Sequence, residues 1–194
     1  MKAFYLLALT LALALPGSAQ VNSEITGKMR QDLDAVARVG SVMVDGDVCL
    51  RIVTRRAKEL MFAVDPRDQF VAGDNYDVDD AAFNATKKTL IRLSHLVTFP
   101  SDVNLWMPIE AHPGKIQMVV RNKNEMSQFW AWGAIYQDTI PQMESVLKTG
   151  QRVTVTEKPG WISVLAPVYS SLGEIVGVLE SVTRAKIDAH ENVK

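Results

Sequence analysis

The chain has 194 residues, of which 47% are hydrophobic, and a formal net charge of −1. This length is sufficient for one well-packed domain, and the nearly neutral charge without a basic block argues against a nucleic-acid partner. Cys49 is the only cysteine, so no internal disulfide can form. Its place on an apolar stripe with Leu50 and Val53 predicts a buried structural thiol, with a reactive thiol as the alternative.

The N-terminus has the pattern of a secretory signal peptide. Lys2 supplies a positive charge, Ala3 to Leu15 form an apolar run, and Pro16 ends it. Gly17-Ser18-Ala19 then places small residues at a cleavage site. The run is shorter than the roughly 20 residues of a spanning helix. We therefore expect residues 1–19 to be removed and the protein to be periplasmic or secreted, with an uncleaved N-terminal anchor as the alternative.

Residues 20–75 are predicted to form an N-terminal helical region. After an N-cap at Ser23, apolar residues recur at helical spacing, which predicts one long amphipathic helix over Ser23–Met43. A second helix is expected from Val48 to about Phe62, before an Asp-Pro-Arg-Asp stop.

Three aspartates, Asp77, Asp79 and Asp80, precede a third predicted helix. Carboxylates suit a helix N-terminus, where free N–H groups and the macrodipole favour negative charge. Capping is the preferred interpretation and a metal site the alternative, because the spacing does not match a calcium loop. His95 lies on this helix and is expected to approach the core.

From residue 100 the pattern becomes that of strands. Two β-rich runs joined by a Pro-Gly turn predict a hairpin, and an aromatic segment and a short helix follow. Asp138 or Thr139 would cap that helix, Pro141 lies in its first turn and Gly150 ends it. The predicted strands are Val103–Ile109, Ile116–Arg121, Arg152–Thr156, Trp161–Val168 and Glu174–Thr183. The expected fold is α+β, with an antiparallel five-stranded sheet, a long N-terminal helix and flanking helices.

Three motifs stand in the last part of this pattern. A helix ends in Leu147-Lys148-Thr149-Gly150, a strand closes in Ala166-Pro167-Val168-Tyr169, and Gly173-Glu174-Ile175-Val176-Gly177-Val178-Leu179 follows. Together with the order of the elements, they resemble the Cache family of PAS-like extracytoplasmic sensor domains. The resemblance predicts a single sensor domain at 76–184, followed by a polar tail at 185–194.

The resemblance implies a ligand between the sheet and the linker that joins the second and third strands, here Arg121–Tyr136. An arginine in this place would clamp a carboxylate, and Trp and Tyr rings would wall an apolar pocket or cage a cation. The alternatives are rings that belong to the core and an arginine on the surface. The predicted ligand-binding residues are Arg121, Trp130, Trp132, Tyr136 and Tyr169.

No motif for nucleophilic, phosphate-binding or zinc chemistry is present in the sequence. We therefore expect no catalytic residues, no metal and no cofactor, and not an enzyme. The expected function is an exported sensor-like module without its own signalling output, which binds a small organic molecule and acts through a partner such as a membrane-bound signalling protein. The alternatives are a non-covalent haem or gas sensor that uses His95, and a ligand-free interaction domain that forms a homodimer through the Ser23–Met43 helix.

Overall fold

The structure, a computed structural model, describes residues 17–63, 67, 77–130 and 134–185, with side chains from residue 24 onward within the first helix. The helices are α1 (Gly17–Met43), α2 (Gly46–Ile52), α3 (Arg55–Leu60), α4 (Asp80–Ser94) and α5 (Pro141–Thr149). The strands are β1 (Asp102–Pro108), β2 (Lys115–Val120), β3 (Gln137–Asp138), β4 (Val153–Val155), β5 (Trp161–Tyr169) and β6 (Ile175–Arg184).

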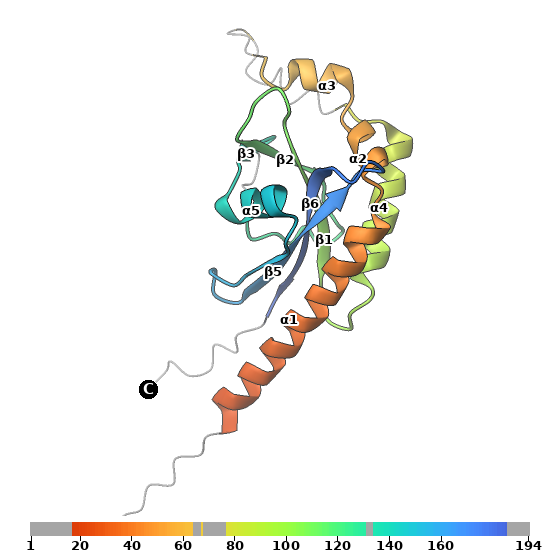
Figure 1. Cartoon of the computed structure of the whole chain (residues 1–194). Coiled ribbons are helices and arrows are strands. Elements are labelled where there is room, and N and C mark those ends of the chain that lie inside the picture. The colour runs from red at the N-terminus through yellow and green to blue at the C-terminus, as the bar shows by residue number, and fades with distance from the viewer. Residues whose placement is uncertain (1–16, 64–66, 68–76, 131–133, 186–194) are drawn as a thin grey trace, which may run out of the picture.

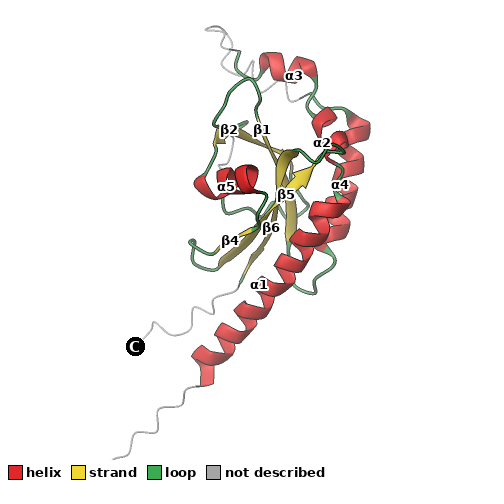
Figure 2. Ribbon diagram, in the orientation of Figure 1, coloured by secondary structure: helices red, strands yellow, loops and turns green. Residues whose placement is uncertain are grey.

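The strands form one antiparallel sheet in the order β3-β2-β1-β6-β5-β4. Strands β1 and β6, from opposite ends of the sheet-forming sequence, therefore lie side by side at its centre. Helices α1, α2 and α4 lie on one side of the sheet and α5 lies on the other (Figures 1 and 2). This arrangement confirms the predicted α+β class, the antiparallel sheet and the long N-terminal helix.

The sheet has six strands in the described part of the chain, so the predicted number of five is wrong. The additional strand, β3, pairs Gln137 with Ile116 and Asp138 with Lys115 at the edge of the sheet. An ion pair of 2.7 Å between Lys115 Nζ and Asp138 Oδ1 accompanies this pairing. Two residues are too few to show the period-two alternation by which a strand is recognised in sequence.

Helix α1 ends at Met43, as predicted, and begins at Gly17, before the expected Ser23. The predicted signal peptide lies outside the described residues as far as residue 16. No helix in the described part of the chain has an apolar stretch long enough to cross a membrane. Helix α1 is fastened to the sheet by Ser41 Oγ, which donates to Pro167 O at 2.6 Å, and by the pairing of Asp34 with Arg152, whose Nε lies 2.8 Å from Oδ1.

The prediction of a single helix over 48–62 is wrong, because the chain forms two short helices, α2 and α3, in this region. Asp45 caps α2 by accepting hydrogen bonds from the N–H groups of Asp47 and Val48. Thr54 then has an extended backbone and caps α3, its hydroxyl accepting from Ala57 N. The break lets Val53 form a β-bridge with Val78. A tertiary contact therefore interrupts the helix, although the apolar spacing typical of a helix continues in the sequence.

The cap of α4 is confirmed, because Asp79 accepts a hydrogen bond from Ala82 N at 2.8 Å. The predicted side-chain cap of α5 is wrong: Ile140 occupies the N-cap without a side-chain hydrogen bond, and Asp138 belongs to β3. Pro141 in the first turn and Gly150 at the end, with a left-handed φ of 68°, are as predicted.

Two apolar layers pack on the two faces of the sheet. The larger one joins α1, α2 and α4 to the sheet, so the N-terminal helical region and the sheet share one core. The smaller one lies under α5 and includes Trp106, Met143, Leu165 and Val178. Because side chains alternate along a strand, Asp102, Asn104 and Trp106 share one face of β1. A row of buried polar side chains therefore lies on the α5 side of the sheet.

Candidate functional site

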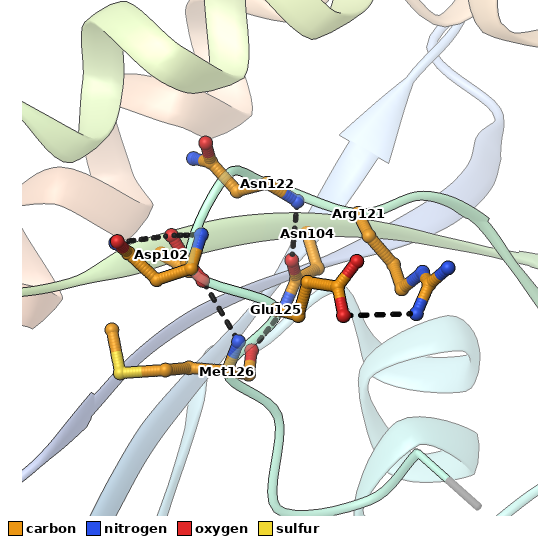
Figure 3. Close-up of polar contacts among 7 residues, drawn as sticks. Asp102, Asn104, Arg121, Asn122, Glu125 and Met126 are labelled. Atoms are coloured by element: carbon orange, nitrogen blue, oxygen red, sulfur yellow. Dashed lines mark hydrogen bonds and ion pairs between the residues drawn. The ribbon is translucent and has the colours of Figure 1, made fainter. Parts of the chain in front are cut away.

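The linker after β2 crosses the α5 side of the sheet and is held there by buried polar side chains of β1. Asp102, which has no exposed surface, accepts from both N–H donors of Asn124, the backbone N and Nδ2, at 3.3 and 2.9 Å. Its second oxygen accepts from Met126 N at 2.8 Å (Figure 3). Burial raises the pKa of the Asp102 carboxyl, and the hydrogen bonds from Met126 and Asn124 oppose this rise.

Two asparagines fix the beginning of the linker. The side-chain oxygen of Asn104 accepts from Asn122 N at 3.0 Å, and its Nδ2 donates to Met126 O at 2.7 Å (Figure 3). Asn122 Nδ2 in turn donates to Leu90 O of α4 at 3.1 Å. Between these anchors Glu125 has a φ of 55°, a left-handed conformation that costs energy for a residue with a Cβ. The linker is therefore held in a tight, partly strained turn.

A second buried carboxylate, Glu180, lies on β6 directly opposite Asn104 and is completely inaccessible. Within the sheet it accepts hydrogen bonds from Trp106 Nε1 at 3.0 Å, Ser163 Oγ at 3.0 Å and Asn104 Nδ2 at 3.4 Å. From the linker it accepts from Ser127 Oγ at 2.7 Å and Gln128 N at 3.3 Å.

All five of these donors are uncharged groups. Among the described residues no Lys or Arg forms an ion pair with Glu180. Burial raises the pKa of the Glu180 carboxyl, and the hydrogen bonds from Ser127, Trp106, Ser163 and Asn104 offset only part of that rise. The centre of the sheet therefore contains a carboxyl group that binds a proton more readily than an exposed glutamate.

Two of the predicted ligand residues meet in the linker. The guanidinium of Arg121 lies 4.3 Å from the centre of the Trp130 ring, and Arg121 Nη1 is 3.7 Å from Glu125 Oε2. Trp130 is half-buried and packs against the apolar layer under α5. The positive charge of Arg121 is thus already engaged by its own linker.

The other predicted ligand residues are placed elsewhere. The Tyr136 ring packs against Phe62 in a tilted arrangement, with ring centres 4.3 Å apart, and Phe62 also contacts His112. Tyr169 is at the end of β5, where its hydroxyl lies near Gly150. Trp132 lies outside the described residues. Arg121 and Trp130 are the two predicted residues that the structure brings into contact.

His95 does not approach the core, contrary to expectation. It is exposed at the C-cap of α4, and its Nε2 lies 2.9 Å from Lys123 Nζ. The helix ends one residue earlier, which turns the imidazole towards the linker surface. Cys49 is buried, as predicted, and burial raises its pKa to about 12. Within the described ranges no group of three or more His, Cys, Asp or Glu side chains is arranged to hold a metal ion.

The sequence-based prediction missed Asp102 and Glu180. A signal existed: Glu180 is the one charged residue in the otherwise apolar or small run 175–182, and Asp102-x-Asn104-x-Trp106 places polar atoms on alternate positions of one strand. Chemically the arrangement is a set of acceptor oxygens beneath a linker, with aromatic side chains beside it. No family model matches the chain, and neither the curated proteins nor the solved structures give a match.

Proposed function

We propose that the protein is an exported small-molecule-binding module of the Cache sensor type. Its ligand is a small organic molecule with N–H or O–H donors, bound between the linker 121–136 and the α5 side of the sheet. The order of elements supports this proposal, because a hairpin, a linker, a helix and three further strands build one antiparallel sheet. The module would pass its signal to a membrane-bound partner.

The observation that carries the proposal is the burial of Glu180 beneath the linker. A buried carboxylate without a cation is expensive, and a sheet of this size could be built with an apolar residue in its place. Strongly perturbed carboxyl groups of this kind cluster at functional sites. Two of the five donors, Ser127 Oγ and Gln128 N, come from the linker and can be exchanged for donors of a ligand when the linker moves aside.

The linker has the properties of a segment that can be displaced. Its first part is held to the sheet by hydrogen bonds with Asp102, and the left-handed Glu125 stores strain that opening would release. When it is displaced, Asn104, Trp106, Ser163 and Glu180 would face the incoming molecule together. The half-buried ring of Trp130 would provide an apolar wall.

A thermal-shift screen of the purified protein against organic acids, amines and amino acids tests this function, together with native mass spectrometry for a co-purifying molecule. A ligand should raise the melting temperature of the wild type. The shift should be smaller in Glu180→Gln, which changes the acceptor of the ligand, and larger in Ser127→Ala, which removes a linker donor that the ligand replaces. It should be unchanged in Ser171→Ala, an exposed serine in the β5–β6 turn. If no compound gives a shift and no small molecule co-purifies, the proposal is overturned.

A second candidate, an interaction domain, is favoured by the apolar side chains exposed on α1. Ile25 is 52% exposed, Val42 82% and Met43 61%. Exposed apolar side chains on a helix favour a surface that contacts another protein.

A further inference from the structure

Helix α1 carries a second stripe besides the one that faces the sheet. The core-facing stripe contains Leu33, Val36, Ala37 and Gly40, all of them buried. The second stripe follows the three-four spacing of a heptad repeat, which brings its members onto one side of the helix. Its members are Ile25, Lys28, Asp32, Ala35, Val39 and Val42.

The middle of this second stripe forms one wall of a groove. The hollow has a volume of ≈ 120 Å³ and lies between α1 and the segment that follows α4. The other wall is made by Leu96, which is 59% exposed, and by Val97. The lining residues are Asp32, Ala35, Val36, Val39, Leu96 and Val97. The groove is therefore apolar, with one carboxylate near its end.

The N-terminal part of the same helix lies before the buried core begins. Among the described side chains of α1, from residue 24 onward, the first that is fully buried is Leu33. Met29 before it is partly buried, and residues 24–28 are exposed or half-exposed. Figure 1 shows this end of α1 extending beyond the sheet. The molecule thus presents a protruding amphipathic helix and, further along the same helix, a groove of matching chemistry.

We propose that the protein forms a two-fold dimer in which the protruding half of α1 of each copy lies antiparallel in the groove of the other. In this register Ile25 of the partner subunit lies against Ala35, and Lys28 of the partner subunit lies beside Asp32. One register satisfies both contacts, because Ile25 and Lys28 are three positions apart in sequence, as are Asp32 and Ala35. The two-fold axis repeats both contacts.

Charge selects this orientation. In a parallel pair of helices each stripe residue would face its own copy, which would place Lys28 against Lys28 of the partner subunit and Asp32 against the partner's Asp32. In the antiparallel pair the two symmetry-related contacts between Lys28 and Asp32 join opposite charges. The exposed Glu24 and Arg38 of the flanking positions also face each other. Neither Lys28 nor Asp32 forms an ion pair with another described residue. This inference is independent of the proposed small-molecule function.

Charge reversal tests the register by sedimentation or light scattering over a dilution series. Lys28→Glu and Asp32→Lys should each weaken the dimer by about 10-fold, because two attractive contacts become repulsive. The double variant should regain the affinity of the wild type. Arg30→Glu is the matched control, since Arg30 lies on the opposite side of the helix from Lys28 and should leave dimerisation unchanged. A wild type that is monomeric at every concentration, or a double variant as weak as the single ones, overturns the proposal.

Cross-linking tests the orientation separately. The double variant Ile25→Cys/Ala35→Cys should form a covalent dimer under mild oxidation, because the two positions face each other across the interface. Ile25→Cys alone should not, since its counterpart is distant in the antiparallel pair. The native Cys49 is buried and does not compete. If the single variant cross-links efficiently, the helices are parallel and the proposed register is wrong.

Discussion

Trp106 and Glu180 lie on neighbouring central strands, and the indole Nε1 donates a hydrogen bond of 3.0 Å to the carboxylate although both side chains are buried. The contact is diagonal, since the register of β1 and β6 places Asn104 opposite Glu180 and Trp106 opposite Val178. The polar centre of the sheet is thus built from both strands and is completed by the linker above it.

Replacement of Glu180 by Gln should change the pH dependence of stability. The pKa of Glu180 is raised in the folded protein, whereas an unfolded glutamate titrates at about 4.3. As pH rises above that value the unfolded chain loses its proton first, so the contribution of this group to stability is complete below pH ~4 and is lost as pH rises through the folded pKa. Glu180→Gln should therefore gain stability relative to the wild type with increasing pH, measured by urea unfolding.

Asp102 provides the internal control for this effect. Its pKa is also raised by burial, so part of the pH dependence should persist in Glu180→Gln and disappear when Asp102→Asn is added. Glu180→Leu should instead lose stability at every pH, by about 2 kcal/mol or more, because it leaves the indole N–H of Trp106 and other buried donors without an acceptor. If the free energies of unfolding of the wild type and of Glu180→Gln differ by a constant amount from pH 4 to 8, the raised pKa of Glu180 is contradicted.

Much of the framework follows from local sequence signals, whereas the candidate site does not. Local sequence patterns predict the end of α1, the hairpin, the Asp79 cap and the Gly150 stop, because each of these features depends on residues close in sequence. The burial of Glu180 does not follow from a local pattern. An acid on a strand is ordinarily placed on a solvated face, and it is buried here because a linker more than 50 residues away in sequence covers it.

The broken helix after Asp45 has the same kind of cause. Its apolar spacing continues through Val53, but Thr54 Oγ1 donates to Asp77 Oδ2 at 2.8 Å, and Asp79 N donates to Ile52 O. These contacts join residues that are more than 20 positions apart in sequence, and they determine where the helix stops. The hydrophobic periodicity of a short stretch of sequence does not reveal contacts with distant residues. For the same reason the two-residue strand β3 was not predicted.

Gly46→Ala should destabilise the fold by about 1–3 kcal/mol, the usual cost of overpacking. A Cβ on Gly46 would collide with the carbonyl oxygen of Tyr169 and would lie 2.6 Å from its carbon. Both atoms belong to the backbone, so α2 and the end of β5 must separate. The matched control is Gly27→Ala in α1, where a Cβ meets no atom within 4 Å; this change should be neutral or stabilise by up to about 1 kcal/mol. Equal effects of the two substitutions would show that the close approach of α2 to β5 is not required.

Glu125 offers a test of strain in the linker. Because its φ is 55°, Glu125→Gly should be more stable than Glu125→Ala by about 1 kcal/mol, even though glycine loses more conformational entropy on folding. Both variants lose the ion pair with Arg121, so their difference isolates the backbone. Thermal or urea unfolding measures it, and an alanine variant at least as stable as the glycine variant would mean that the turn is unstrained.

Cys49 should behave as an inert thiol until the protein unfolds. It has no exposed surface, and burial raises its pKa to about 12, although a hydrogen bond with Thr86 opposes the rise. Only the thiolate reacts with disulfide reagents. In buffer at pH 8, labelling with an aromatic disulfide should therefore be slow and limited by opening of the protein around Cys49. In urea, where the protein is unfolded, labelling should be immediate. Because an unfolded thiol ionises near pH ~8.5 and the folded one does not, stability should also fall as pH rises above that value.

The neighbouring position supplies the control for this labelling experiment. Leu50 is 45% exposed on the outer side of α2, so Leu50→Cys should show one thiol that reacts at once and a second, Cys49, that reacts only on opening. The two thiols then report on the same molecule under identical conditions. Rapid reaction of Cys49 in the native wild type would mean that the layer between α2 and α4 opens readily, and the core packing of this region would have to be revised.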